Sequence, residues 1–369
     1  MQLIILKENL SKALTIVNRS ISNKPQIPVL SSILLKTDKN FLIVSSTNLE
    51  IGIIIKTNAK IEKEGEAIIP GKLLTEFVNS LNAEKIEIIL EGNKLFVKTN
   101  KTHASFATGN PSEFPPFPDL PEVTKTFSLN KIKEAIVRTV FAASVDEARP
   151  VLTGVKTIIS QGVVSLTATD GYRLSIEQVE IPDKKEELRV ILPAQSLLEM
   201  VRIAVEVKAE EVGFSIIENK NQVVFILPNI LIYTRLIDGE FPNTDKIIPQ
   251  SFKTKIIVEK EQLTSAVKTT SLFARGAANI IKIKIEKDGL RLSANTPQVG
   301  EDEVFVDAKV EGEESEIAFN FRFLLDLLAN FPEENIILET SGSLNPGVFK
   351  PASTKLSYLH LVMPVRVQG

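Results

Sequence analysis

The sequence contains no cysteine and only two histidines, His103 and His360, among its 369 residues. Without cysteine the chain can form no disulfide, no thiolate nucleophile and no cysteine-bound zinc site. Two histidines exclude a histidine-rich metal site and leave few candidates for a histidine-based proton relay. These absences point to the cytoplasm and away from much hydrolytic and redox chemistry.

The chain also lacks long apolar runs and an excess of one charge. No stretch of about 18 uncharged apolar residues occurs, so no membrane span is predicted. The first residues, MQLIILKENL, have no basic start, long apolar run or small-residue cleavage site, and do not form a signal peptide. The net charge of −3 argues against tight nucleic-acid binding over the whole surface. With 43% hydrophobic and 24% charged residues, the composition is that of an ordinary globular protein with real cores.

An internal repeat runs through the chain. Leu10 and Ile132 occupy matching positions 122 residues apart. Three apolar segments align on Pro70, Pro193 and Asn320, which are 123 and 127 residues apart. Because one third of 369 is 123, the sequence predicts three tandem domains. Their boundaries fall near proline-rich stretches and give domains at 1–121, 122–247 and 248–369.

Apolar periodicity predicts two helices in each domain. Apolar residues recur every three or four positions over 10–17 and over 263–270, as on one face of a helix. The segments at 73–78 and 197–201 predict shorter helices in the second half of a repeat. Six helices are expected in all.

Alternating residues between these helices predict β-hairpins. Residues 281–285 alternate strictly, a turn follows at Asp288-Gly289, and the chain returns over 290–292. A similar hairpin is predicted around Gly92-Asn93. The predicted fold class is therefore α+β, with three copies of a domain that carries two helices and antiparallel sheets.

Six similar half-units suggest an arc or a ring. Helices of about 11 Å diameter, packed about 9 Å apart, leave a bore of roughly 6 Å when six of them form a circle. Twelve helices leave roughly 23 Å, which is enough for a B-form duplex of about 20 Å. A closed ring around DNA would therefore need two chains.

Four motifs, in order along the chain, resemble those of a known protein family. They are RTVFA at 138–142 with RPVLTG at 149–154, TATDGYRL at 167–174, DGEFP at 238–242, and LVMPVR at 361–366. Together with the threefold repeat, they resemble the bacterial DNA polymerase III beta subunit family of replicative sliding clamps. The resemblance implies a head-to-tail homodimeric ring, of which one chain forms half, with helices lining the hole. It implies no catalytic activity and no cofactor, and it implies a tether for polymerase that an ATP-driven clamp loader opens.

A sliding ring needs weak phosphate contacts rather than base recognition. Basic residues on or near the predicted helices are the candidates for these sequence-independent contacts with double-stranded DNA. They are Lys12, Arg19, Lys24, Arg138, Arg202, Lys268, Arg275 and Arg322. The alternative for each is a lysine or arginine on the solvated face of an amphipathic helix. The acidic run from Glu301 to Glu316 is expected on an outer surface that repels phosphate, with some acids pairing with a neighbouring subunit.

The resemblance also implies a pocket between the second and third domains for short peptides. Its partners would be the polymerase III catalytic subunit, the clamp loader and other proteins with a clamp-binding motif. Apolar walls with a few polar groups suit such a site, and a methionine adds a deformable contact. The expected wall consists of Leu152, Thr169, Gly171, Tyr172, Arg173, Leu174, Pro242, Lys246, Ile247, Pro346, Val362, Met363, Pro364, Val365 and Arg366. The alternatives are an ordinary turn at Asp170-Gly171 and a last strand with alternating burial.

Three apolar residues are expected at the seam between the two chains. The resemblance brings Phe106 at the end of the first domain against Leu272 and Phe273 of the other chain. The alternative is that each residue belongs to the core of its own domain.

Two competing functions remain open from the sequence. The chain could be a repeat scaffold that binds peptides but no DNA. It could also be a small-molecule enzyme that uses carboxylates such as Asp170, although the sequence shows no clustered acid pair. No metal site and no membrane partner are expected.

Overall fold

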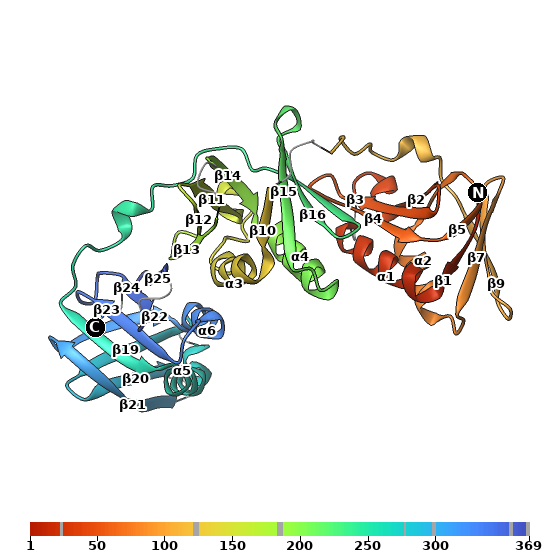
Figure 1. The fold of residues 1–369 in the computed structure, drawn as a ribbon. Helices are drawn as coiled ribbons and strands as arrows, with labels where there is room; N and C mark the ends of the chain where they lie inside the picture. The colour runs from red at the N-terminus through yellow and green to blue at the C-terminus, as the bar shows by residue number, and fades with distance from the viewer. Residues whose placement is uncertain are drawn as a thin grey trace. The chain divides into compact units, whose positions relative to one another are not determined.

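The computed structural model describes residues 1–22, 25–120, 125–182, 187–276, 278–296, 300–353 and 357–366. Within these residues the chain forms six α-helices, two in each predicted domain (Figure 1). They are α1 (Lys7–Val17), α2 (Gly71–Ser80), α3 (Leu129–Val140), α4 (Ala194–Glu206), α5 (Lys260–Ala274) and α6 (Phe321–Asn330). Six short 3-10 helices are η1 (Asn18–Ser20), η2 (Pro28–Ser31), η3 (Pro111–Glu113), η4 (Pro150–Thr153), η5 (Glu218–Lys220) and η6 (Asp245–Ile247).

The chain divides into two compact units. The first unit contains Met1–Asn130 and Ser196–Leu236, and it holds two antiparallel sheets. One sheet has the order β5 (Lys60–Lys63), β1 (Gln2–Leu6), β7 (Lys85–Glu91), β8 (Lys94–Lys98), β9 (His103–Ala107). The other has the order β10 (Lys125–Ser128), β15 (Glu211–Ile217), β16 (Gln222–Leu227), β17 (Ile230–Arg235), β4 (Ile51–Asn58), β3 (Phe41–Thr47), β2 (Ser32–Asp38), β6 (Glu66–Pro70).

The second unit contains Lys131–Gln195 and Ile237–Gly369, and its strands form one antiparallel sheet. The sheet begins with β14 (Leu188–Pro193), β11 (Gly154–Ser160), β12 (Val163–Thr169), β13 (Arg173–Glu180), β25 (Ser357–Val362) and β24 (Gly347–Pro351). It continues with β23 (Asn335–Thr340), β18 (Thr254–Glu259), β21 (Gly300–Gly312), β20 (Gly289–Thr296), β19 (Ile280–Glu286) and β22 (Ser315–Asn320).

These units cross the predicted boundaries because strands of neighbouring repeats pair with each other. In the first unit, β17 of the middle repeat pairs with β4, with Ile230 opposite Ile55. In the second unit, β13 of the middle repeat pairs with β25, with Arg173 opposite Val362. Main-chain hydrogen bonds thus extend two of the three sheets from one repeat into the next.

The internal repeat is visible in where the helices begin. Pro70, Pro193 and Asn320 each directly precede the second helix of a repeat, α2, α4 and α6. The Asn320 side chain accepts a hydrogen bond of 3.0 Å from the Arg322 backbone N–H, which caps α6. The alignment of the three segments on these residues is therefore confirmed.

The predicted helices and hairpins are present. The apolar face of α1, made by Leu10, Ala13, Leu14 and Val17, is fully buried. Strands β19 and β20 pair from Ile285 and Leu290 outward. At the hairpin turn, a Cβ on Gly289 would lie 2.4 Å from the Val306 carbonyl oxygen, so only glycine fits there.

A buried ion pair in the second unit corrects one prediction. Arg138 on α3 is 9% exposed, and its Nε donates to Glu177 at 2.7 Å. A second guanidinium bond reaches Glu177 at 2.5 Å, and another reaches Glu134 at 3.2 Å. Burial opposes the charge, but the bonds and charge of Glu177 outweigh it and raise the pKa of Arg138. Arg138 is thus buried and bound to two carboxylates of its own unit, which argues against the predicted contact with a phosphate.

His360 lies beside this ion pair and is completely buried. Its Nδ1 lies 2.8 Å from the Ser175 hydroxyl, its ring stacks on Phe141 with centroids 5.1 Å apart, and its Nε2 has no hydrogen-bond partner among the described residues. Burial, and next the charge of Arg173, lower its pKa from 6.5 to about 3. The folded protein therefore keeps a neutral imidazole at this position.

The pKa of His360 predicts an acid-sensitive fold. Below pH 6.5 the unfolded chain binds a proton that the folded chain does not, so the free energy of unfolding should fall as pH falls toward 3. The slope should approach about 1.4 kcal/mol per pH unit. Urea unfolding at pH 7.5 and 5.5 measures this loss, which should shrink in His360→Gln and persist in the control His103→Gln. Parallel pH curves for the wild type and His360→Gln would contradict the assignment.

Candidate functional site

A tight turn between β12 and β13 forms the centre of the predicted pocket. Asp170 Oδ1 accepts from the backbone N–H groups of Tyr172 at 2.8 Å and Arg173 at 3.0 Å. The Thr169 hydroxyl accepts from the Gly171 N–H and donates to the Arg173 carbonyl. Gly171 has φ of +93°, a backbone conformation that favours glycine. These bonds fix the direction in which Tyr172 and Arg173 leave the turn.

The first unit contains the same turn, 122 residues earlier. Thr47 Oγ1 accepts from the Leu49 N–H, and Asn48 Oδ1 accepts from the N–H groups of the two residues at 50 and 51. The Phe117 ring covers one side of this turn, at Gly52. A Cβ on Gly52 would lie 2.4 Å from that ring. Phe117 also packs on Tyr233, with ring centroids 5.2 Å apart.

Arg173 is held by charges and by aromatic rings. Its Nε donates to Asp170 at 3.0 Å, and its Nη1 donates to Asp326 of α6 at 2.6 Å. The guanidinium carbon lies 4.8 Å from the centroid of Phe323 and 5.6 Å from that of Phe141. Only 10% of the side chain is exposed. Arg173 therefore links the turn to α6 rather than projecting into solvent.

An aromatic and sulfur-containing surface lies beside this arginine. Tyr172 is 61% exposed, and its ring stacks on Phe323 at a centroid distance of 6.4 Å. The Met363 backbone N–H donates to the Tyr172 carbonyl at 2.8 Å, and Met363 is 37% exposed. Partly exposed apolar groups on a fixed backbone are suited to receiving apolar side chains of a peptide. We call Tyr172, Phe323 and Met363 the aromatic wall.

The strand register brings several other predicted pocket residues to this place. Val362 lies opposite both Arg173 and Gly347, so the predicted Pro346 precedes the strand beside it. Leu174 packs with Leu361 and Ile248 in a small buried cluster. Leu152 is buried in η4, whereas Pro242, Lys246 and Ile247 are exposed. Pro364, Val365 and Arg366 complete the described tail, and the Val365 N–H donates to the Ala318 carbonyl at 2.8 Å.

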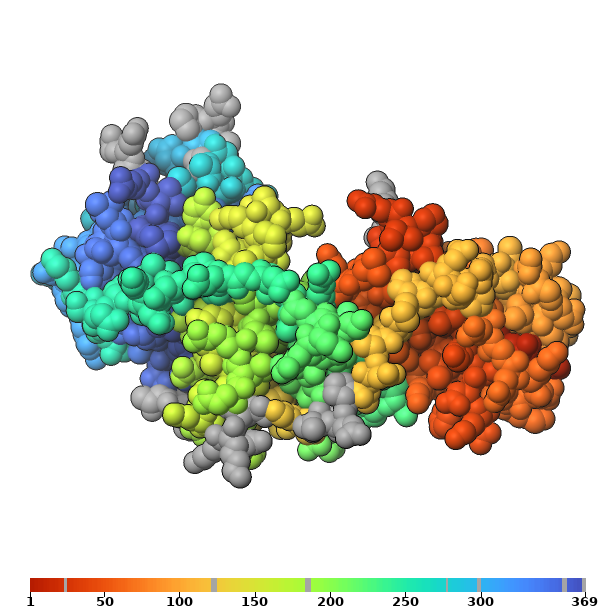
Figure 2. Space-filling view, turned by 90° about the horizontal axis from the view of Figure 1, so that it is seen from above, coloured from red at the N-terminus to blue at the C-terminus, as the bar shows by residue number. Residues whose placement is uncertain are grey.

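The segment at 237–253 runs along the outside of the second unit. Figure 2 shows part of it as a green to teal strip on one face of that unit. Its exposed residues include Pro242, Lys246 and Ile247, and Ile247 is 44% exposed. The part of these three residues in the pocket remains a prediction.

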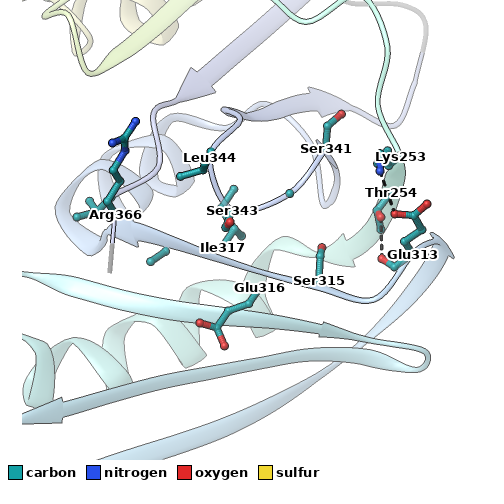
Figure 3. A pocket seen from close by; sticks show the side chains of 13 residues that line it. Lys253, Thr254, Glu313, Ser315, Glu316, Ile317, Ser341, Ser343, Leu344 and Arg366 are labelled. Atoms are coloured by element: carbon teal, nitrogen blue, oxygen red, sulfur yellow. Dashed lines mark hydrogen bonds and ion pairs between the residues drawn. The ribbon is translucent and has the colours of Figure 1, made fainter. Parts of the chain in front are cut away.

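A cavity of about 780 Å³ lies next to the tail (Figure 3). Ser315, Glu316 and Ile317 of β22 line one side, and the loop at 341–344 lies across from them. Lys253 and Glu313 form an ion pair of 3.4 Å at the end opposite Arg366. The cavity shares only Val365 and Arg366 with the predicted wall. It is therefore a separate hollow that the sequence did not predict.

The predicted DNA-contact residues differ in their exposure to solvent and in their ion pairs. Lys12, Lys268, Arg275 and Arg322 are exposed on or at the end of helices. Lys24 lies outside the described residues.

Arg19 and Arg202 share one carboxylate. Arg19 pairs with Glu199 at 3.2 Å and with Glu206 at 2.7 Å, and Arg202 pairs with Glu199 at 2.6 Å. These two arginines are thus partly neutralised by acids of α4, and no local sequence signal points to these acids.

The predicted seam residues differ in their exposure to solvent. Leu272 on α5 is 55% exposed, while Phe273 packs against the core of its own unit. Phe106 is 8% exposed, and its ring meets Phe77 edge-on at 5.3 Å. Phe106 and Phe273 therefore take part in the cores of their own units, and Leu272 is the most accessible of the three.

The sequence missed Phe323 and Asp326, which complete the surroundings of Arg173. In the sequence, α6 looks like an ordinary amphipathic helix, since Leu324, Leu327 and Leu328 form its buried face. Residues 323 and 326 are three positions apart, a spacing that brings side chains together on a helix. This spacing is the only feature of the sequence that links the two residues.

The described residues hold neither a cluster of metal ligands nor a membrane-spanning helix. They contain no group of three or more potential His, Asp or Glu metal ligands. None of their helices is long and apolar enough to cross a membrane.

Comparison with known proteins places the whole chain. Three family models match in succession: the N-terminal domain of the DNA polymerase III beta subunit at 1–118, the central domain at 126–243 and the C-terminal domain at 245–366. The beta sliding clamp of Halalkalibacterium halodurans is 32% identical over 95% of both chains, and that of Staphylococcus aureus is 28% identical over 94% of both.

Solved structures show the same fold. The DNA polymerase sliding clamp of Bacillus subtilis superposes over the full length of both chains, with a TM-score of 0.94 and 27% identity. A sliding clamp from Pseudomonas aeruginosa, solved bound to griselimycin, gives a TM-score of 0.93 and 26% identity, again over the full length of both chains. The threefold repeat, the turn at 169–173 and these matches together establish that the chain belongs to the DNA polymerase III beta subunit family, the bacterial sliding clamps of DNA replication.

Proposed function

We propose that two copies of this chain join head to tail into a ring that encircles double-stranded DNA and tethers the replicative polymerase. The ring itself catalyses nothing and works in the cytoplasm. The observation that carries the proposal is the succession of three matched clamp domains within one chain, each with two helices. Two chains supply the twelve helices that a bore of roughly 23 Å requires.

Exposed cations on the helices would contact the phosphates. Lys12 on α1 and Lys268 on α5 occupy the first helices of the first and third repeats, and both are exposed. The ion pairs of Arg19 and Arg202 with Glu199 reduce the attraction to DNA at that place. A few weak, sequence-independent contacts would let a ring slide, whereas a dense cationic surface would hold it in place.

Two open strand edges support the ring closure. Strand β9 is the last strand of its sheet, and within β21 the residues 300–307 pair only with β20 among the described strands. Lys94 and Lys98 lie beside β9 on the neighbouring strand, and Glu301 and Glu303 are exposed on β21. Pairing of these edges between two chains would satisfy their backbone groups and bring opposite charges together.

The aromatic wall and the turn at 169–173 would receive partner peptides. The partners proposed are the polymerase III catalytic subunit, the clamp loader and other proteins with a clamp-binding motif. Griselimycin, named as bound to the P. aeruginosa clamp, is a defined probe for competition with such a peptide. The remaining pocket residues predicted from the sequence belong to this proposal as well.

DNA retention should depend on the exposed helix lysines. The variant Lys12→Glu/Lys268→Glu should shorten the lifetime of loader-assembled clamp on nicked circular DNA about fivefold or more, because phosphate attraction becomes repulsion. Lys220→Glu/Lys287→Glu makes the same charge change at exposed strand-connecting positions and serves as the control. Clamp that stays on linearised DNA as long as on circles would disprove encirclement and favour a peptide-binding scaffold.

Dimer formation should depend on Leu272. Leu272→Ala removes a 55% exposed side chain at the proposed seam and should raise the dimer dissociation constant about tenfold. Sedimentation equilibrium measures this shift, with Leu344→Ala as a control because Leu344 is also exposed. An unchanged dimer in Leu272→Ala would place the seam elsewhere.

Peptide binding should depend on the aromatic wall. Tyr172→Ala/Met363→Ala should weaken a fluorescein-labelled clamp-binding peptide of the polymerase III catalytic subunit about 10- to 100-fold. Fluorescence anisotropy measures the affinity, and sedimentation should show an unchanged dimer. Leu344→Ala alters the lining of the separate cavity instead and should bind normally. The reverse pattern would move the peptide site into that cavity.

A further inference from the structure

Asp326 makes a contact that its position in the sequence does not suggest. It lies on α6 between buried leucines, and its side chain is 50% exposed, as expected for a solvated acid on an amphipathic helix. Yet its Oδ2 accepts a 2.6 Å hydrogen bond from Arg173, which belongs to the preceding repeat. A short, charge-assisted bond of this kind restricts both side chains.

Arg173 is fixed from several directions at once. Asp170 binds its Nε, and Asp326 binds its Nη1. Phe323 faces the guanidinium at 4.8 Å, within the range of a cation–π contact. The bond to Asp170 joins residues of one turn, so it cannot by itself hold the arginine against α6. Asp326 is the group that makes this connection with a directional bond.

Phe323 transmits this arrangement to the exposed surface. It contacts the guanidinium of Arg173 and also stacks with Tyr172, whose ring is largely exposed. An arginine released from Asp326 could rotate away from Phe323, and the ring would lose its partner. Tyr172 would then stand without a fixed neighbour, at the place where a peptide side chain would be received.

We propose that Asp326 is a positioning residue of the peptide site: by holding Arg173 against Phe323 it keeps the aromatic wall preorganised for apolar peptide side chains. The proposal rests on the peptide binding proposed above. Asp326 itself touches no ligand in this scheme. Preorganisation raises affinity because less conformational freedom is lost when the peptide binds.

The test compares Asp326→Asn, Asp326→Glu and the control Glu334→Gln. Glu334→Gln removes the same charge from an exposed residue after α6. With the labelled polymerase III peptide, Asp326→Asn should raise the dissociation constant about tenfold, because a charge-assisted bond is lost from a half-exposed site. Asp326→Glu should restore most of the affinity, and Glu334→Gln should behave as the wild type.

Tyrosine fluorescence gives a second measurement that does not use a ligand. The chain has no tryptophan and three tyrosines, of which Tyr233 and Tyr358 are 4% and 3% exposed. Acrylamide therefore quenches mainly Tyr172. Quenching should increase in Asp326→Asn and return toward the wild-type value in Asp326→Glu, while the melting temperature stays the same.

Normal affinity and normal quenching in Asp326→Asn would overturn the inference and leave the proposed function standing. Equal weakening by Glu334→Gln would also overturn it, since a general charge effect would then explain the loss. A wild-type protein that fails to bind the peptide would instead contradict the proposed function itself.

Discussion

Strand pairing between successive repeats is the constraint on which the rest of this structure depends. Pairing of β17 with β4, and of β13 with β25, carries the two larger sheets from one repeat into the next. Backbone hydrogen bonds fix both the spacing and the register of the paired strands within each unit. Within the second unit this register brings Arg173 opposite Val362, and thus joins the turn to the tail.

The candidate site combines rigid and adaptable parts. The turn is fixed by side-chain hydrogen bonds of Thr169 and Asp170, and the arginine after it is fixed by two carboxylates. Tyr172 and Met363 remain partly exposed on this support. A fixed backbone with a few exposed apolar groups can serve several partners, because a methionine adapts its shape while the turn does not.

The sequence predicted local features well because they depend on short spacings. The helical face at 10–17 and the hairpin at Asp288-Gly289 follow from period and turn chemistry alone. Contacts between distant segments could not be predicted in this way. Arg138 has the same charge and helical setting as Lys12, and only its burial against Glu177 distinguishes them. The bond between Arg173 and Asp326 likewise joins residues 153 positions apart, with no local signal.

The two copies of the turn have different surroundings. In the first unit the ring of Phe117 lies over Gly52 and Tyr233 and occupies the flank of the turn. In the second unit the position that matches Gly52 is Leu174, which packs against Leu361 and Ile248, whereas Tyr172 two residues earlier remains exposed. The residue that matches Tyr172 in the first copy is Glu50, so of these two copies only the second carries an aromatic side chain at this position. If two chains form the proposed ring, the ring carries two of the proposed peptide sites, and the proposed polymerase and loader partners compete for them.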